Sequence, residues 1–168
     1  MPAPSRVLFV CLGNICRSPT AEAVFRDQAG KAGWGAMFSA DSAGLTNHHA
    51  GHAPDPRSRR AAAQRGYRLD DLRARQLEAV DFSRFDLLLA MDRSVLEAMR
   101  QLQPQDGQAQ AEMALFLDYL PGHEGRDVPD PYYGGDAGFE DVLDLVEAGS
   151  TALLRALLKR QGVLGCGC

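Results

Sequence analysis

One stretch near the N-terminus decides which fold the sequence predicts. It runs Val7-Leu8-Phe9-Val10-Cys11-Leu12-Gly13-Asn14-Ile15-Cys16-Arg17-Ser18-Pro19. Residues 7–10 form a continuous apolar run, which is typical of a strand buried on both faces of a parallel sheet. Ser18 can cap the N-terminus of a helix, and Pro19 suits the first helical position. We therefore expect a strand, a tight loop and a helix in that order.

Strands and helices are expected to alternate along the rest of the chain. An apolar run predicts a strand at 85–91, and further strands are expected at 37–43 and, as a short one, at 73–77. Residues 112–120 fit either a strand or a helical turn. Helices are expected from Asp55 to near Gly66, over 95–102, and between Phe139 and Leu157, where apolar residues recur at helical spacing. This alternation predicts an α/β fold in layers, with ligands bound at the carboxyl ends of the strands of a parallel sheet.

Composition limits the class of protein. The 168 residues are 45% hydrophobic, which fits one domain over 1–162 with a short tail at 163–168. The net charge of -4 argues against nonspecific nucleic-acid binding. The sequence contains no secretory signal and no apolar run of membrane length, so we expect no membrane insertion. The cysteines match neither a zinc site nor a disulfide framework, which favours a reducing, cytoplasmic compartment; they are Cys11, Cys16, Cys166 and Cys168.

The loop after the first strand has the features of a phosphate cradle. Backbone N–H groups that turn inward make an anion nest, and the following helix adds the positive end of its dipole. Arg17 can donate two parallel hydrogen bonds to a phosphate, a geometry that lysine lacks. The expected phosphate-binding residues are Leu12, Gly13, Asn14, Ile15, Cys16, Arg17 and Ser18.

Cys11 is the candidate nucleophile of this cradle. The helix N-terminus and Arg17 favour its thiolate, and the Ser18 hydroxyl can stabilise the sulfur as a leaving group. The chemistry implied is phosphoryl transfer to sulfur followed by hydrolysis. An isolated cysteine at a strand end is more often a small buried apolar residue, but the glycine, asparagine, arginine and serine that follow it favour catalysis.

Two loops carry a resemblance to a known family. The stretch from Cys11 to Ser18 resembles the signature loop of low-molecular-weight protein tyrosine phosphatases, and Asp130-Pro131-Tyr132-Tyr133-Gly134 resembles their general-acid loop. A thinner similarity extends through 41–44 and 91–92. The resemblance implies a three-layer flavodoxin-like fold with a central four-stranded parallel sheet. It also implies a monomeric phosphotyrosine phosphatase that forms a phosphocysteine intermediate and needs no cofactor or metal.

The resemblance assigns the catalytic roles to Cys11 as nucleophile, Arg17 as phosphate clamp and Asp130 as general acid and base. An acid suits the chemistry, because the phenolate that leaves phosphotyrosine has a pKa of about 10 and departs faster when protonated. Without the signature loop, Asp130-Pro131 would be interpreted as an ordinary turn.

The sequence departs from the family pattern at two positions, one in the substrate cleft and one that supports the signature loop. Tyr132 and Tyr133 are expected to form one wall, while His48 stands where relatives commonly carry Trp or Tyr. The histidines at 48, 49 and 52 fit a solvated loop better than a metal site. Leu72 occupies the place of a histidine that often supports the signature loop. We expect Asn14 and Ser42 to hold the loop by bonding to each other.

Several alternatives stay open at this stage. Cys16 fits a redox partner of Cys11 and a packing residue equally well, and Cys166 and Cys168 have no assigned role. An arsenate reductase would need further cysteines between Cys16 and Cys166, where none occurs. A protein arginine phosphatase usually has Thr in place of Ile15 and a single aromatic in place of the tyrosine pair. A catalytically silent binding module would be expected to have lost a catalytic residue. The expected partners are phosphotyrosine proteins, with a bacterial tyrosine kinase as a candidate.

Overall fold

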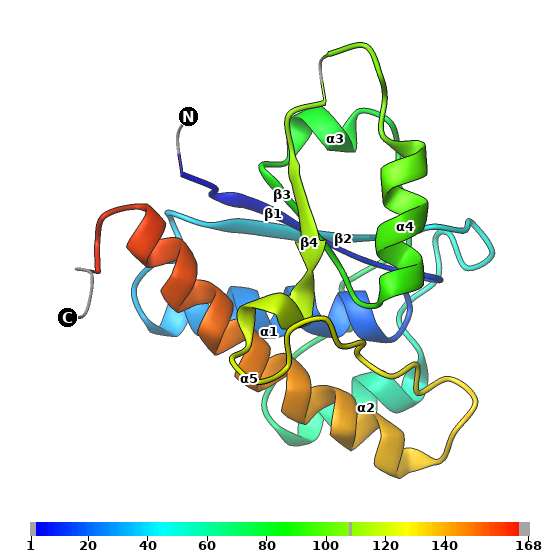
Figure 1. The fold of residues 1–168 in the computed structure, drawn as a ribbon. Coiled ribbons are helices and arrows are strands. Elements are labelled where there is room, and N and C mark those ends of the chain that lie inside the picture. The colour runs from blue at the N-terminus through cyan, green and yellow to red at the C-terminus, as the bar shows by residue number, and fades with distance from the viewer. Residues whose placement is uncertain (1–2, 108, 165–168) are drawn as a thin grey trace.

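The computed structural model describes residues 3–107 and 109–164 (Figure 1). The elements follow in chain order: β1 (Arg6–Cys11), α1 (Arg17–Lys31), β2 (Ser39–Gly44), α2 (Pro56–Gln64), α3 (Asp81–Arg84), β3 (Leu87–Ala90), α4 (Arg93–Leu102), β4 (Glu112–Leu115), a 3-10 turn (Phe116–Tyr119) and α5 (Asp136–Arg160). The strands form one parallel sheet in the order β2-β1-β3-β4. The predicted α/β, flavodoxin-like architecture is confirmed.

The central strand β1 explains why the opening stretch is apolar without interruption. Its neighbours β2 and β3 pair with its two edges, and helices cover both of its faces. Val7 and Phe9 pack into one core cluster, while Leu8 and Val10 pack into a second. Both faces exclude water, so every position along the strand favours an apolar side chain.

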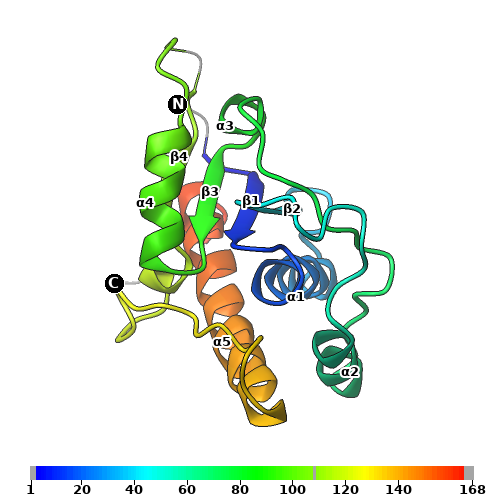
Figure 2. The same ribbon diagram turned by 90° about the vertical axis from the view of Figure 1, so that its right-hand side faces the viewer.

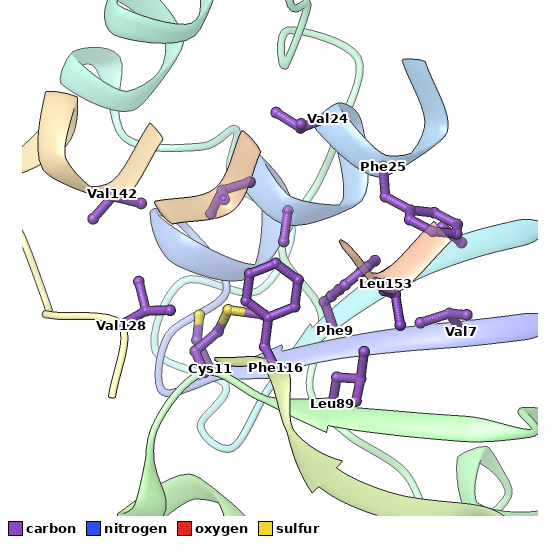
Figure 3. Packing of buried hydrophobic residues seen from close by; sticks show 14 of the residues in the cluster. Val7, Phe9, Cys11, Val24, Phe25, Leu89, Phe116, Val128, Val142 and Leu153 are labelled. Atoms are coloured by element: carbon purple, nitrogen blue, oxygen red, sulfur yellow. The ribbon is translucent and has the colours of Figure 1, made fainter. Parts of the chain in front are cut away.

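Helices lie on both faces of the sheet, with α1 and α5 on one side and α4 on the other (Figures 1 and 2). Figure 3 shows Phe9, Phe116 and Leu153 close together in the core that α1 and α5 cover. The ring of Phe9 lies 5.9 Å from that of Phe25 and 5.8 Å from that of Phe116. Helix α2 packs against α5 farther from the sheet.

Two local predictions were wrong. The first helix begins at Arg17 with Cys16 as its N-cap, so Ser18 is helical and does not cap it. The Ser18 hydroxyl instead faces Cys11 and Asn14 inside the loop. The expected strand at 73–77 makes only an isolated bridge from Gln76 to Gly44, within the described part of the chain, because β2 ends there.

The remaining differences concern element boundaries. The strand expected over 37–43 spans Ser39–Gly44, and that over 85–91 is shortened to Leu87–Ala90. Residues 112–120, which fitted either a strand or a helical turn, contain both, because β4 is followed directly by the 3-10 turn. The short helix α3 was not anticipated. Among the residues that the structure describes, no helix has the length and apolar character needed to span a bilayer.

The order of the strands fixes where a ligand can bind. Strands β1 and β3 are neighbours in the sheet. The chain leaves β1 toward β2 on one side and leaves β3 toward β4 on the other, so the two connections diverge. Such a switch point leaves a crevice at the carboxyl ends of the strands. Cys11 is the last residue of β1 and therefore lies at this crevice.

Candidate active site

The loop between β1 and α1 contains a backbone conformation that residues other than glycine seldom adopt. Asn14 has a φ of 57°, in the left-handed region. Its side-chain amide donates to Ser18 Oγ at 2.8 Å and to Ser42 Oγ at 2.9 Å. Its Oδ1 accepts from the backbone N–H of Arg75 at 3.0 Å. The expected bond between Asn14 and Ser42 is present, and these three contacts together offset the backbone strain.

Cys11 is buried beneath this loop, with 3% of its surface exposed. The backbone N–H of Asn14 donates to its Sγ at 3.3 Å, and Ser18 Oγ lies 3.0 Å from the same sulfur. Hydrogen-bond donors aimed at a sulfur stabilise its anionic form. The arrangement suits a sulfur that acts first as nucleophile and later as leaving group.

Arg17 is almost fully buried at the start of α1. Its Nη1 donates to Asp92 Oδ2 at 2.7 Å and to the carbonyl of Val128 at 3.0 Å, while its Nη2 lies 3.7 Å from Asp130 Oδ2. Burial favours a higher pKa for Asp92, but hydrogen bonds from Ser94, the Val95 amide and Arg17 outweigh it and hold that pKa below its usual value. Asp92 is therefore an anion that orients the guanidinium.

These groups open onto one pocket with a cavity volume of about 180 Å³. Its lining brings together most of the side chains that the sequence singled out: Cys11, Leu12, Gly13, Ile15, Cys16, Arg17, His48, Asp130, Tyr132 and Tyr133, joined by Thr46 and His49. Asn14 and Ser18 support the loop from beneath, as their hydrogen bonds show. A cradle at the end of a strand thus faces a carboxyl group and aromatic rings across a narrow space.

The comparisons with known proteins show the family of this chain. The family model described as low molecular weight phosphotyrosine protein phosphatase matches residues 6–163. This chain belongs to that family. A low molecular weight protein-tyrosine-phosphatase of Streptomyces coelicolor is 51% identical over 154 residues, which cover 90% of this chain and 93% of the relative.

Solved structures of the phosphatase family have the same fold. A protein tyrosine phosphatase from Entamoeba histolytica superposes with a TM-score of 0.85 at 35% identity, covering 95% of this chain and 99% of that one. A Drosophila arginine phosphatase superposes with a TM-score of 0.84 at 30% identity, covering 89% and 96% respectively. The fold therefore accommodates more than one phosphorylated side chain.

In this member of the phosphatase family, Arg75 supports the loop between β1 and α1. Its backbone N–H reaches Asn14, and its guanidinium lies between Asp41 at 3.1 Å and Asp81 at 3.0 Å. Asp81 is fully buried, so the ion pairs anchor the Arg75 backbone firmly against the loop. Sequence reasoning missed this support because the donor is a backbone group.

A buried carboxyl that the sequence analysis also missed lies behind Ser42. The Ser42 hydroxyl donates to Glu22 Oε1 at 2.7 Å, and Arg26 forms an ion pair with Glu22 at 2.7 Å. Burial raises the pKa of Glu22, although the Ser42 hydrogen bond and the Arg26 charge oppose this effect. Because the Ser42 hydroxyl donates its hydrogen bond to Glu22, its oxygen accepts the hydrogen bond from the Asn14 side-chain amide.

Two histidines line the pocket, His48 as expected and His49 in addition. His48 lines the pocket but is exposed, whereas His49 is half-buried, with its ring 6.4 Å from that of Tyr132. A Cβ added at Gly13 would lie 3.2 Å from His49 Cδ2, so His49 packs directly on the signature loop. Tyr133 is 91% exposed and contacts Tyr132 edge-on at 4.9 Å. His49 and Tyr132 thus form the inner walls, and Tyr133 the rim.

Cys16 is a second buried thiol of the pocket. Burial raises its pKa to about 12, with the charges of Asp55, Cys11 and Asp130 adding to the rise and a hydrogen bond with Ser58 opposing it. Cys11 and Cys16 are both free thiols in this structure. Cys166 and Cys168 lie outside the described residues.

Proposed function

We propose that this phosphatase hydrolyses phosphotyrosine in proteins through a phosphocysteine intermediate. The observation that carries the proposal is the convergence of Cys11, Arg17 and Asp130 on one pocket walled by His49 and Tyr132. A thiol, a buried guanidinium and a carboxyl are the three groups that phosphoryl transfer through sulfur requires.

In the first step the Cys11 thiolate attacks phosphorus while the bond from phosphorus to the phenolic oxygen breaks. Asp130 gives its proton to the departing oxygen, so that tyrosine leaves as a neutral phenol. Arg17 and the loop N–H groups bind the phosphoryl oxygens, over which the negative charge is spread in the transition state. The products are phosphocysteine and a dephosphorylated peptide.

In the second step water attacks the phosphocysteine. Asp130, now a carboxylate, takes a proton from the water as the bond from sulfur to phosphorus breaks. The sulfur leaves as a thiolate, stabilised by the Asn14 amide and the Ser18 hydroxyl. Inorganic phosphate is released and the enzyme returns to its starting state.

The lining of the pocket favours phosphotyrosine over phosphoarginine. Ile15 and the aromatic rings of His49, Tyr132 and Tyr133 offer apolar contact to a flat ring. A reducing cytoplasm suits the mechanism because Cys11 must stay a free thiol. A tyrosine kinase that forms the substrates is the partner class consistent with this activity.

Turnover of a phosphotyrosyl peptide by the parent, Cys11→Ser and Asp130→Asn tests the proposal. We expect no turnover with Cys11→Ser and a loss of about 10²- to 10⁴-fold with Asp130→Asn. The parent should release phosphate from a phosphoarginyl peptide far more slowly. Full activity of Cys11→Ser would refute the nucleophile, and preferred cleavage of phosphoarginine would refute the substrate.

A further inference from the structure

Arg57, in the first turn of α2, connects two loops that are far apart in sequence. Its Nη2 donates to the carbonyl of Tyr132 at 3.0 Å, and its Nη1 to the carbonyl of Gly134 at 3.5 Å. Both carbonyls belong to the loop that carries Asp130. Within residues 130–134 the other hydrogen bonds are local, from Tyr132 N–H to Asp130 Oδ1 at 3.0 Å and from Gly134 N–H to the Pro131 carbonyl at 3.2 Å. The second oxygen of Asp130, Oδ2, lies 3.7 Å from Arg17 Nη2.

The contact with Tyr132 leads directly to the carboxyl group of Asp130. Tyr132 accepts from Arg57 through its carbonyl and donates to Asp130 through its N–H. The position of the Tyr132 backbone therefore determines where Asp130 Oδ1 is held. A guanidinium that fixes this residue orients the carboxyl group without touching it.

The other side of Arg57 is fixed by Asp55, a buried residue. Arg57 Nε and Nη2 donate to the two oxygens of Asp55 at 3.1 Å and 3.0 Å, a bidentate ion pair. The Asp55 backbone N–H donates to the carbonyl of Ile15 at 2.8 Å. Ile15 belongs to the signature loop, so one chain of hydrogen bonds runs from the phosphate cradle through Asp55, Arg57 and Tyr132 to Asp130.

Aromatic contacts restrict Arg57 further. Its guanidinium carbon lies 5.6 Å from the ring centre of Tyr132 and 4.6 Å from that of Phe139. A planar cation can stack on rings and keep its in-plane donors free for oxygens, which an ammonium group cannot do. Arginine is therefore required at this position by both sets of contacts.

We propose that Arg57 is a positioning residue for the general acid, which it holds over the phosphate cradle through Tyr132. The inference rests on the proposed function, because it assumes that Asp130 protonates the leaving group. Without Arg57 the exposed loop, with Gly134 and Gly135 at its end, samples positions in which the carboxyl group misses the phenolic oxygen. The phosphate cradle itself keeps its contacts.

Leaving-group dependence distinguishes this role from a general loss of structure. A poor leaving group needs the acid, whereas an aryl phosphate with a strongly acidic phenol, such as a dinitrophenyl phosphate, departs without it. We expect Arg57→Met to lower kcat/KM for a phosphotyrosyl peptide by about 10- to 100-fold, and for the dinitrophenyl ester by less than about threefold. Arg57→Lys, which keeps the charge but not the bidentate geometry, should lie between.

Arg60→Met is the matched control. Arg60 lies on the same helix, is exposed, and its side chain makes no hydrogen bond or ion pair within the described residues. The variant loses the same charge without touching the acid loop, so both substrates should be turned over at the parental rate. Thermal unfolding of each variant shows whether the fold is retained.

A double-mutant cycle completes the test. If Arg57 acts through Asp130, adding Arg57→Met to Asp130→Asn should cause almost no further loss of kcat/KM for the phosphotyrosyl peptide. Equal losses on both substrates, or additive losses in the cycle, would overturn the positioning role. If Asp130→Asn itself shows no leaving-group selectivity, the proposed acid is wrong, which is a failure of the proposed function and is recognised separately.

Discussion

Gly44, the last residue of β2, lies directly beneath the signature loop. A Cβ at this position would stand 2.9 Å from the carbonyl oxygen of Leu12, 3.0 Å from the amide nitrogen of Asn14 and 3.0 Å from the carbonyl carbon of Gly13. All three atoms belong to the backbone, so no side-chain rotation can relieve the clash. Gly44→Ala is therefore expected to displace the cradle.

The size of the displacement follows from the contact distances. Ordinary van der Waals contact begins at 3.4 Å, so the loop must move by up to 3.4 − 2.9 = 0.5 Å. Overpacking of this kind costs about 1–3 kcal/mol of stability. Since a 1 Å misplacement of reacting groups can cost about 10²-fold in rate, we expect kcat/KM to fall by about 10-fold.

The assay compares kcat/KM, inorganic phosphate binding and thermal unfolding of Gly44→Ala with those of Gly30→Ala. A Cβ at Gly30, an exposed position in α1, would meet no atom within 4 Å. Gly30→Ala should keep full activity and gain up to about 1 kcal/mol from helix propensity. Parental phosphate affinity and turnover in Gly44→Ala would refute the reasoning.

Three further substitutions test the fold. The hydrogen bond from Arg6, with backbone hydrogen bonds, lowers the pKa of Asp86 from 3.8 to about 2, so its stabilisation is present above pH 3.8 and is lost as pH falls through 2. Asp86→Asn should lower the free energy of unfolding by about 1 kcal/mol at neutral pH, after allowance for solvent screening, and by little near pH 2, as measured in urea. Gly149→Ala should lower it by about 1–3 kcal/mol, because the Cβ would lie 2.6 Å from the ring of Phe116. Arg65→Met should lower it by about 1 kcal/mol at low salt, with a smaller effect at high salt, because three carboxylates of α5 then lose the cation that they share and repel each other.

Each of these outcomes has a direct contradiction. A stability difference for Asp86→Asn that persists unchanged at pH 2 would exclude linkage to this carboxyl group. Unaltered thermal unfolding of Gly149→Ala would show that the Phe116 ring can move aside. A salt-independent loss in Arg65→Met would point to packing by the arginine stem rather than to charge.

The layered fold was predictable because its signals are local in the sequence. The unbroken apolar run of β1 follows from burial on both faces, and helical spacing is clear in α5. Ser18 was misassigned because a cap residue and a residue that points a hydroxyl into the loop have the same sequence signature. Gln76 was misassigned because pairing depends on where β2 ends.

The residues of the candidate site were predictable only in part. Cys11 and Arg17 belong to one short loop, so their spacing identifies them together. Arg57 and Tyr132 are 75 residues apart, and the bond from the Arg75 amide to Asn14 spans 61 residues. Every residue except proline has a backbone N–H, so residue type does not show which of them donates to the loop. The sequence also does not show which of two adjacent histidines, His48 or His49, packs beside Tyr132.

The central position of β1 has a consequence for the order in which the molecule assembles. The strand that carries Cys11 precedes the elements that cover its edges and faces, which are β2, β3 and, farthest along the described chain, α5. Long-range pairing of this kind forms slowly. Asp130 lies in the loop that directly precedes α5, and it lines the pocket of Cys11. The surroundings of Cys11 are therefore completed only when α5 has packed against α1.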